Sequence, residues 1–265
     1  MRIQRTMFLV ALAAITTTAA PAAAKTKSDG TKPMPAKVRA ALAGVTQETL
    51  DAVGVSKLDS ETTFKRRRLS GEPLTKDGKP ELLAGFLEWC PHCAANSWSL
   101  VIALQKFGTF KGLRILDTGT YFQREANGSK TMKHTKGVSF SRATFTSDLL
   151  AFVPVVVQDR NGKYKTKFTK KLNAQLDNPS TFPAANFGGL YSTADAAYDP
   201  EFLGGPKKTW LQVAATANDP NDALGQRIDS AANFFTAMIC AMTGDQPAEV
   251  CSTAAVTAAK AALPA

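Results

Sequence analysis

The hydrophobic pattern is densest in the middle of the chain, where it predicts a strand, a helix and a second strand. Leu82–Trp89 is a compact apolar run that suits a strand buried on both faces. After Pro91, apolar side chains recur at helical spacing as far as Gly108. Gly112–Leu116 then predicts a second strand, whose short connection favours parallel pairing with the first. We therefore expect a strand–helix–strand unit of the α/β class.

Shorter elements are expected on both sides of this unit. Alternating or β-branched runs predict strands at Thr62–Leu69, Val138–Phe145, Leu149–Gln158, Ala184–Phe187 and Leu190–Tyr191. The Asp159–Gly162 turn leads into a further strand expected over Lys163–Phe168. Helices are expected at Gln47–Val53, Lys170–Leu176, Lys207–Ala217 and Asp222–Met242. The polar stretch Tyr121–Lys136 is interpreted as a loop or insertion, with His134 as a solvated residue in it.

The first residues have the three-part pattern of a secretory signal peptide. Arg2 and Arg5 precede the apolar run Met7–Ile15, and small residues lead to a cleavage site after Ala24. A retained membrane anchor is the alternative, but the run is shorter than the roughly 20 residues a spanning helix needs. We therefore expect an exported protein, secreted or periplasmic, with residues 1–24 removed. Residues 25–45 are interpreted as a flexible linker, 46–252 as the folded domain and 253–265 as an Ala-rich tail.

Composition excludes two classes of protein but does not identify a function. The 265 residues are 44% hydrophobic, which excludes a disordered chain, and four cysteines are too sparse for a disulfide-dense miniprotein. The formal charge of +10 falls to +8 when the two signal-peptide arginines are lost (10 − 2). Much of this charge lies in Lys65–Arg68 and Lys163–Lys171. Both stretches would be explained as edge strands whose lysines prevent pairing with other chains. Attraction of these stretches to an anionic envelope surface is the alternative.

Cys90 and Cys93 form a CxxC pair at the junction of the predicted strand and helix. Cys90 would lie where the first helical N–H groups lack partners, so these donors and the helix dipole would stabilise its thiolate. Pro91 opens the helix, and a protonated His92 would add positive charge. Cys93 would then resolve the mixed disulfide that Cys90 forms. A fixed structural disulfide between Cys90 and Cys93 is the main alternative. A zinc site is disfavoured, because the candidate cysteine and histidine ligands are poorly spaced.

Cys240 and Cys251 form the second pair. Cys240 lies in the last predicted long helix, and Cys251 follows the turn Gly244–Pro247. A bridge across so short a loop is expected to be structural, because no helix N-terminus activates Cys240. Exchange of this pair with Cys93, in a relay, is the functional alternative.

The residues around the CxxC pair resemble those of a known superfamily. Trp89–Cys93 is similar to the thioredoxin superfamily motif, and its Cys-Pro-His-Cys sequence is similar to that of DsbA-type oxidases. Over about residues 62–252, the chain more closely resembles a thioredoxin-like family catalogued as a domain of unknown function (number 929). The blocks that carry this likeness include Gly71–Phe107, Phe182–Tyr191 and Ile239–Cys251.

This resemblance implies a thioredoxin-like α/β fold, with a central mixed sheet flanked by helices, an inserted loop or strand region and extra C-terminal helices. It also implies that Pro183 is a cis-proline held against the CxxC pair, and that the backbone at Phe182 docks the substrate chain. Phe182 is larger than the residues common before the cis-proline of thioredoxin-like proteins, and Asn96-Ser97 departs from the Glu-Arg pair of the family at that place.

Two functions remain open at this level. The first is an exported thiol–disulfide oxidoreductase that oxidises cysteines of other exported proteins through Cys90 and Cys93, without a cofactor or metal. Its substrates would be protein thiols, and an unknown redox partner would reset the pair. The second is a non-catalytic envelope protein with two structural disulfides, whose basic faces bind an anionic surface. A nucleic-acid role conflicts with export and has no motif to support it.

Overall fold

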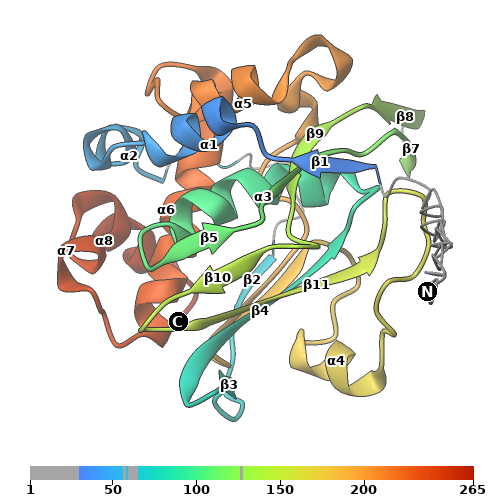
Figure 1. The fold of residues 1–265 in the computed structure, drawn as a ribbon. Coiled ribbons are helices and arrows are strands. Elements are labelled where there is room, and N and C mark those ends of the chain that lie inside the picture. Colours follow the sequence, from blue (N-terminus) through green and yellow to red (C-terminus); the bar gives the residue numbers. More distant parts are fainter. Residues whose placement is uncertain (1–29, 56–57, 59–64, 126–127) are drawn as a thin grey trace, which may run out of the picture.

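The computed structural model describes residues 30–55, 58, 65–125 and 128–265 and shows a mixed α/β protein (Figure 1). The expected signal peptide, residues 1–24, lies outside the described residues. Eight α-helices lie within the described part of the chain: α1 (Ala36–Ala43), α2 (Gln47–Val53), α3 (Pro91–Leu104), α4 (Lys170–Gln175), α5 (Trp210–Thr216), α6 (Ala223–Met242), α7 (Ala248–Cys251) and α8 (Ala254–Ala261). Among the described helices, none has the length and apolar character needed to cross a membrane.

The largest sheet has β4 (Lys79–Leu87) as a central strand. Its parallel neighbour is β11 (Ala151–Gln158), and its antiparallel neighbour is β12 (Ala184–Phe187). The sheet continues through β13 (Tyr191–Ala194) to the edge strand β2 (Lys65–Arg68), while β3 (Thr75–Lys76) forms a tight hairpin with β4. Residues 81–86 of β4 are all buried, which explains the continuous apolar run in the sequence.

The predicted parallel pairing of Gly112–Leu116 with the first strand is wrong. This region forms β6 (Arg114–Asp117), which lies between β1 (Thr31–Pro33) and β9 (Lys136–Ser139) in a separate antiparallel sheet. Gly112 has φ +74°, and a Cβ there would lie 2.3 Å from the carbonyl oxygen of Arg142. The chain therefore turns sharply before β6, and the β-branched strand β11 takes the parallel position beside β4.

Two antiparallel two-stranded sheets complete the described strands. β5 (Thr109–Lys111) pairs with β10 (Thr144–Thr146), and β7 (Thr120–Glu125) pairs with β8 (Gly128–Lys133). The β7–β8 hairpin is the insertion expected from the polar stretch in the sequence. The strand expected over Lys163–Phe168 does not form. Within this stretch only Tyr164 makes a β-bridge, an isolated one to Gln158.

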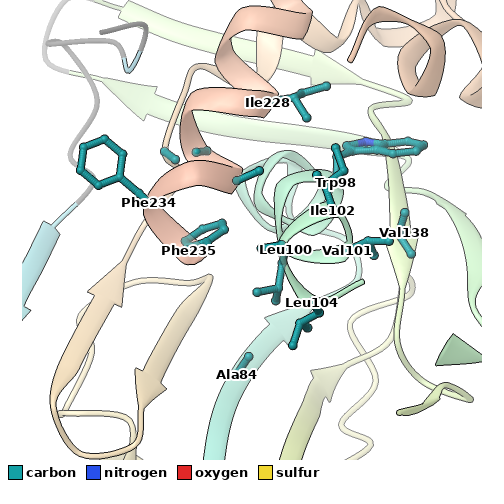
Figure 2. Close-up of a cluster of buried hydrophobic side chains, with 14 of the residues drawn as sticks. Ala84, Trp98, Leu100, Val101, Ile102, Leu104, Val138, Ile228, Phe234 and Phe235 are labelled. Carbon is teal, nitrogen blue, oxygen red and sulfur yellow. The ribbon is translucent and has the colours of Figure 1, made fainter. Parts of the chain in front are cut away.

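The main core lies where α3 and α6 pack together. Figure 2 shows Trp98 of α3 near Ile228 of α6, Leu100 on the side of α3 that faces Phe235, and Val101 beside Val138 of β9. Every residue of α3 except His92 is buried, and Phe187 of the central sheet stacks on Phe235 at a centroid distance of 6.1 Å. The helix that begins at Cys90 is therefore held rigidly by packing along its length.

Both ends of the described chain are more ordered than expected. The linker assigned to residues 25–45 is wrong from Thr31 onward, because β1 pairs with β6 and α1 buries Val38 and Leu42. The Ala-rich tail assigned to residues 253–265 contains α8, which packs against α6 and buries Val256 and Ala259. Small alanine side chains allow this close helix packing, so a segment that looked featureless extends the core.

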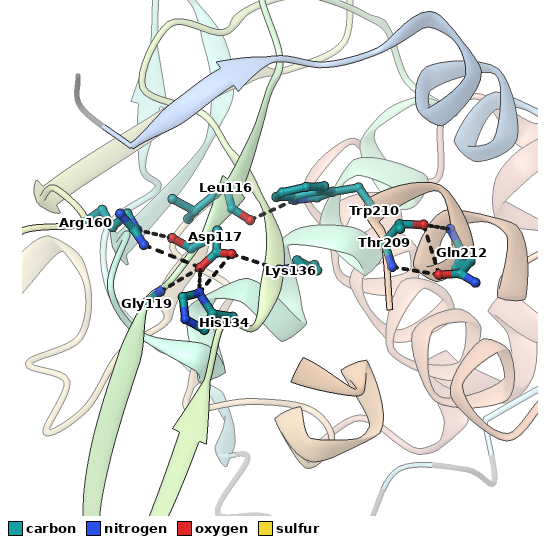
Figure 3. Close-up of polar contacts among 9 residues, drawn as sticks. All are labelled: Leu116, Asp117, Gly119, His134, Lys136, Arg160, Thr209, Trp210 and Gln212. Carbon is teal, nitrogen blue, oxygen red and sulfur yellow. Dashed lines mark hydrogen bonds and ion pairs between the residues drawn. The ribbon is translucent and has the colours of Figure 1, made fainter. Parts of the chain in front are cut away.

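Asp117, at the end of β6, gathers cationic side chains from several elements (Figure 3). Its carboxylate accepts hydrogen bonds from Lys136 Nζ at 2.8 Å and from the half-exposed His134 at 3.0 Å. Arg160 donates to the Asp117 backbone carbonyl at 2.5 Å. Burial raises the pKa of Asp117, but these and other hydrogen bonds outweigh it and hold the pKa below the usual range. His134 is thus part of a hydrogen-bond network around Asp117 that ties the second sheet to the loop after β11.

Candidate functional site

Cys90 is the N-cap residue of α3 and directly follows the loop after β4. Its backbone is extended (φ −88°, ψ 122°), and Pro91 occupies the first turn of the helix. The Cys90 carbonyl accepts the hydrogen bond from the amide of Ala94 at 3.1 Å, which starts the helix. This is the position that the sequence predicts, and it directs the unpaired N–H groups of the helix toward the Cys90 sulfur.

The two thiols of the CxxC pair have different surroundings. Cys90 is 5% exposed and Cys93 is 3% exposed. Cys90 Sγ lies 3.8 Å from the carbonyl oxygen of Phe182, whereas Cys93 Sγ accepts a hydrogen bond from the amide of Leu87 at 3.3 Å. The Cys90 sulfur therefore faces the loop before β12, and the Cys93 sulfur faces the end of β4.

These surroundings shift the two pKa values in opposite directions. The hydrogen bond from the Cys93 thiol lowers the pKa of Cys90 most, and the charge of His92 and backbone amides lower it further, against the effect of burial. Burial raises the pKa of Cys93 well above its ordinary value, and the neighbouring Cys90 raises it more. Deprotonation is therefore favoured at Cys90.

Asp195 links the helix that carries the thiols to the loop that faces them. Its carboxylate lies 2.6 Å from His92 Nδ1, and the two side chains are 11% and 19% exposed. The Asp195 amide donates to the carbonyl of Pro183 at 2.8 Å, and the Asp195 carbonyl accepts from Asn96 Nδ2 at 3.0 Å. Asp195 adopts φ +72°, a left-handed conformation that these contacts hold in place.

The Phe182–Pro183 peptide bond is cis, as the resemblance implies. Phe182 packs over Gly85 of β4, where an added Cβ would lie 2.8 Å from the Phe182 ring. Phe168 contacts the same ring edge-on at a centroid distance of 5.6 Å. The missing side chain at Gly85 therefore makes room for the large ring of Phe182.

Asn96 and Ser97 are buried and hydrogen-bonded. Asn96 accepts from the amide of Ala197 at 2.8 Å in addition to its bond with Asp195, and Ser97 Oγ accepts from the amide of Val138 at 2.8 Å. Nearby, buried Glu88 accepts a short hydrogen bond from Ser139. Neutral hydrogen bonds thus fasten α3 to the loop after β13 and to β9.

The second cysteine pair forms a disulfide, which joins the end of α6 to α7. The Cα atoms of Cys240 and Cys251 are 5.6 Å apart, and both residues are buried in the core. Asp245 completes the one group of candidate metal ligands within the described ranges, but both sulfurs of that group are engaged in the disulfide. The predicted pairing of Cys240 with Cys251 is confirmed, and its structural role stays a prediction.

Sequence reasoning located the thiols but missed the acidic residues near them. Asp195 reaches the site only through the tertiary fold, because it is 103 positions from its partner His92, whereas Glu88 lies two residues before Cys90. A single aspartate after a short strand carries no pattern that distinguishes it from a turn residue. The left-handed backbone of Asp195 is also invisible in the sequence.

Comparison with known proteins gives one match. Neither the curated proteins nor the solved structures include one that matches the chain. Residues 65–169, from β2 to the residue before α4, match the model of a family described as a domain of unknown function, DUF929, and this range includes the CxxC pair.

Proposed function

We propose that this protein is an exported thiol–disulfide oxidoreductase with a thioredoxin-like fold, similar in its motif to DsbA-type oxidases. The observation that carries the proposal is the position of Cys90. It caps a buried helix, its thiol pKa is lowered while that of Cys93 is raised, and its sulfur faces the backbone before a cis-proline. This combination suits a nucleophile whose partner chain docks beside it.

The order of elements around the site supports the thioredoxin-like assignment. A central strand leads into the CxxC helix, and β11 returns parallel beside that strand. The cis-proline then precedes an antiparallel strand on its other side. The cysteine pair and Pro183 consequently meet at one edge of the sheet, which is the arrangement that the sequence resemblance implies.

In the proposed reaction, the protein enters with a disulfide between Cys90 and Cys93. A client thiolate attacks Cys90 Sγ, a client–Cys90 disulfide forms, and the Cys90–Cys93 bond breaks with Cys93 leaving as a thiolate that takes up a proton. A second client thiolate then attacks the client sulfur and expels Cys90 as a thiolate. The client dithiol is oxidised by two electrons, and the protein pair is reduced by two. A separate disulfide-bearing partner must reoxidise the pair.

The different pKa directions fit these steps. The lowered pKa of Cys90 makes it the better leaving group in the second step and favours the reduced form of the protein. The raised pKa of Cys93 keeps its thiol protonated after it leaves, which disfavours its return attack on the client–Cys90 disulfide. His92, which is paired with Asp195, contributes positive charge beside the Cys90 thiolate.

Oxidation of a dithiol peptide by the preoxidised protein tests this function. Wild type should oxidise the peptide stoichiometrically, and Cys90→Ser should not. In a second assay, reduced Cys93→Ser is mixed with the peptide in its disulfide form; Cys90 should attack that disulfide, expel one peptide thiol and accumulate a Cys90–peptide mixed disulfide, detectable by mass spectrometry. Equal peptide oxidation by wild type and Cys90→Ser would remove the proposal and favour a structural disulfide on a non-catalytic protein.

A further inference from the structure

A strongly basic segment runs beside the candidate site, between β11 and the cis-proline. No acidic residue occurs from Arg160 to Leu176, and five exposed lysines lie in this stretch: Lys163, Lys165, Lys167, Lys170 and Lys171. Tyr164 is also 67% exposed, which is unusual for a large aromatic side chain. The segment does not form the regular edge strand expected from sequence. It folds back along the end of the edge strand β11, where the amide of Lys165 donates to the carbonyl of Val157 at 2.9 Å, and its lysine side chains remain exposed.

This basic segment touches the site on two sides of Cys90. Gln158, which bridges to Tyr164, accepts a hydrogen bond from the indole of Trp89 at 2.6 Å, and Trp89 immediately precedes Cys90. At the other end, Phe168 packs on Phe182, whose carbonyl faces the Cys90 sulfur. The segment that carries the lysines is therefore anchored near Trp89, which precedes Cys90 in the sequence, and on Phe182, which faces Cys90 in space.

A second basic surface borders the cis-proline loop from the opposite direction. Lys65 of β2 is in register with Ala194, which pairs with Ala184, so Lys65 lies at the same end of the sheet as Pro183. A groove of about 220 Å³ opens there, lined by Lys65, Arg67, residues 176–180 and residues 192–194. The acidic group in this groove, Asp177, is bound by Arg67 at 2.9 Å and by Ser192 at 2.7 Å.

From this arrangement we propose that the site selects cysteines flanked by acidic residues, in extended segments of client proteins. Positive charge on both sides of the docking loop would attract such segments and raise their local concentration at Cys90. The exposed or half-buried aromatic rings of Trp89, Tyr164 and Phe182 suit contact with a peptide chain. An anionic membrane fits less well, because the cationic groups border a loop and a groove and do not share one flat helix face.

This inference rests on the proposed function, but its binding step can be measured without thiol chemistry. Three labelled peptides of equal length would carry acidic, neutral or basic residues around two serines in place of the cysteines. Binding to the reduced protein would be followed by fluorescence anisotropy at low and high salt. Matched dithiol peptides would give oxidation rates with the preoxidised protein.

The variant K163Q/K165Q/K167Q removes three charges beside the site. The control K37Q/K76Q/K111Q removes three exposed charges from α1, β3 and β5. Lys76 lies near the start of β4 and Lys111 follows the end of α3, so both are at the ends of these elements that are remote from Cys90. We expect wild type and the control to bind the acidic peptide about tenfold more tightly than the basic peptide at low salt. The site variant should lose most of this preference, and high salt should abolish it in all three proteins.

Each outcome bears on a different claim. Equal binding of acidic and basic peptides by wild type, or equal loss in the two triple variants, would overturn the acidic-client inference. If neutral dithiol peptides are oxidised in that case, the proposed function survives without it. If peptides are not discriminated but anionic phosphatidylserine vesicles sediment with wild type and not with the site variant, the basic segment binds membranes and the inference is overturned. Preferential acidic binding without any thiol oxidation would overturn only the proposed function.

Discussion

The buried carboxyl group of Asp229 predicts an unusual dependence of stability on pH. Asp229 lies on α6 with 0% exposure, and among the described residues neither of its carboxylate oxygens has a hydrogen-bond partner. Burial raises its pKa from 3.8 to about 8, with only partial opposition from the charge of Lys106. The folded protein therefore keeps this carboxyl protonated at neutral pH, whereas the unfolded chain ionises it.

The sign and size of the effect follow from linkage. Below about pH 4 both states hold the proton, and above about pH 8 neither does. Between these limits the folded state binds one proton more, so the free energy of unfolding falls by about 1.4 kcal/mol for each unit that pH rises. Over the interval of about four units, the loss from this one group is on the order of 5 kcal/mol, comparable to the total stability of many domains.

Asp229→Asn removes the titration and keeps the size of the side chain. Its stability relative to wild type should rise with pH from 5 to 8 and then level off. Urea unfolding at pH 5, 6, 7, 8 and 9 would measure this difference, with Asp219→Asn, an exposed residue in the turn before α6, as the control. Parallel pH profiles for Asp229→Asn and wild type would refute the reasoning, and so would the same divergence in the control.

Three further predictions concern the site and its supports. His92→Gln should raise the pKa of Cys90 because it removes a positive charge, so the pH midpoint of iodoacetamide alkylation should move upward; an unchanged or lower midpoint would contradict this. Asn96→Ala should lower the free energy of unfolding by about 2 kcal/mol, since it breaks two buried hydrogen bonds; a loss near zero in urea titrations would show that water replaces them. The double change Cys240→Ser/Cys251→Ser removes a disulfide across 11 positions. It should lower the free energy of unfolding by about 3 kcal/mol in urea titrations, while peptide oxidation persists. Loss of oxidation in the folded variant would instead favour a relay.

The central strand, the CxxC helix and the position of Cys90 were predictable from sequence because each has a local cause. The apolar run of β4 and the helical spacing after Pro91 report burial directly. The Cys240–Cys251 pairing followed from the short turn between the two cysteines. In each case the structure is determined by residues that are close together in the sequence.

The errors arose where distant contacts decide the structure. The sharp turn at Gly112 sends β6 to a second sheet, and the segment after Lys163 stays irregular although its residues alternate. Asp195 is part of the site because a strand 100 residues away ends beside His92. Such placements depend on packing between layers of the fold, which a residue pattern does not encode.

The reduction potential of the Cys90–Cys93 pair tests the central claim most directly. Equilibration of the protein in glutathione buffers, followed by thiol labelling and a gel shift, would measure it, with Cys93→Ser to assign the band. Structural disulfides in secreted proteins usually lie below about −300 mV. We predict that Cys90–Cys93 exchanges readily and has a potential well above that value, while Cys240–Cys251 stays oxidised. A Cys90–Cys93 potential below about −300 mV, with no exchange in mild reductant, would contradict the proposed function.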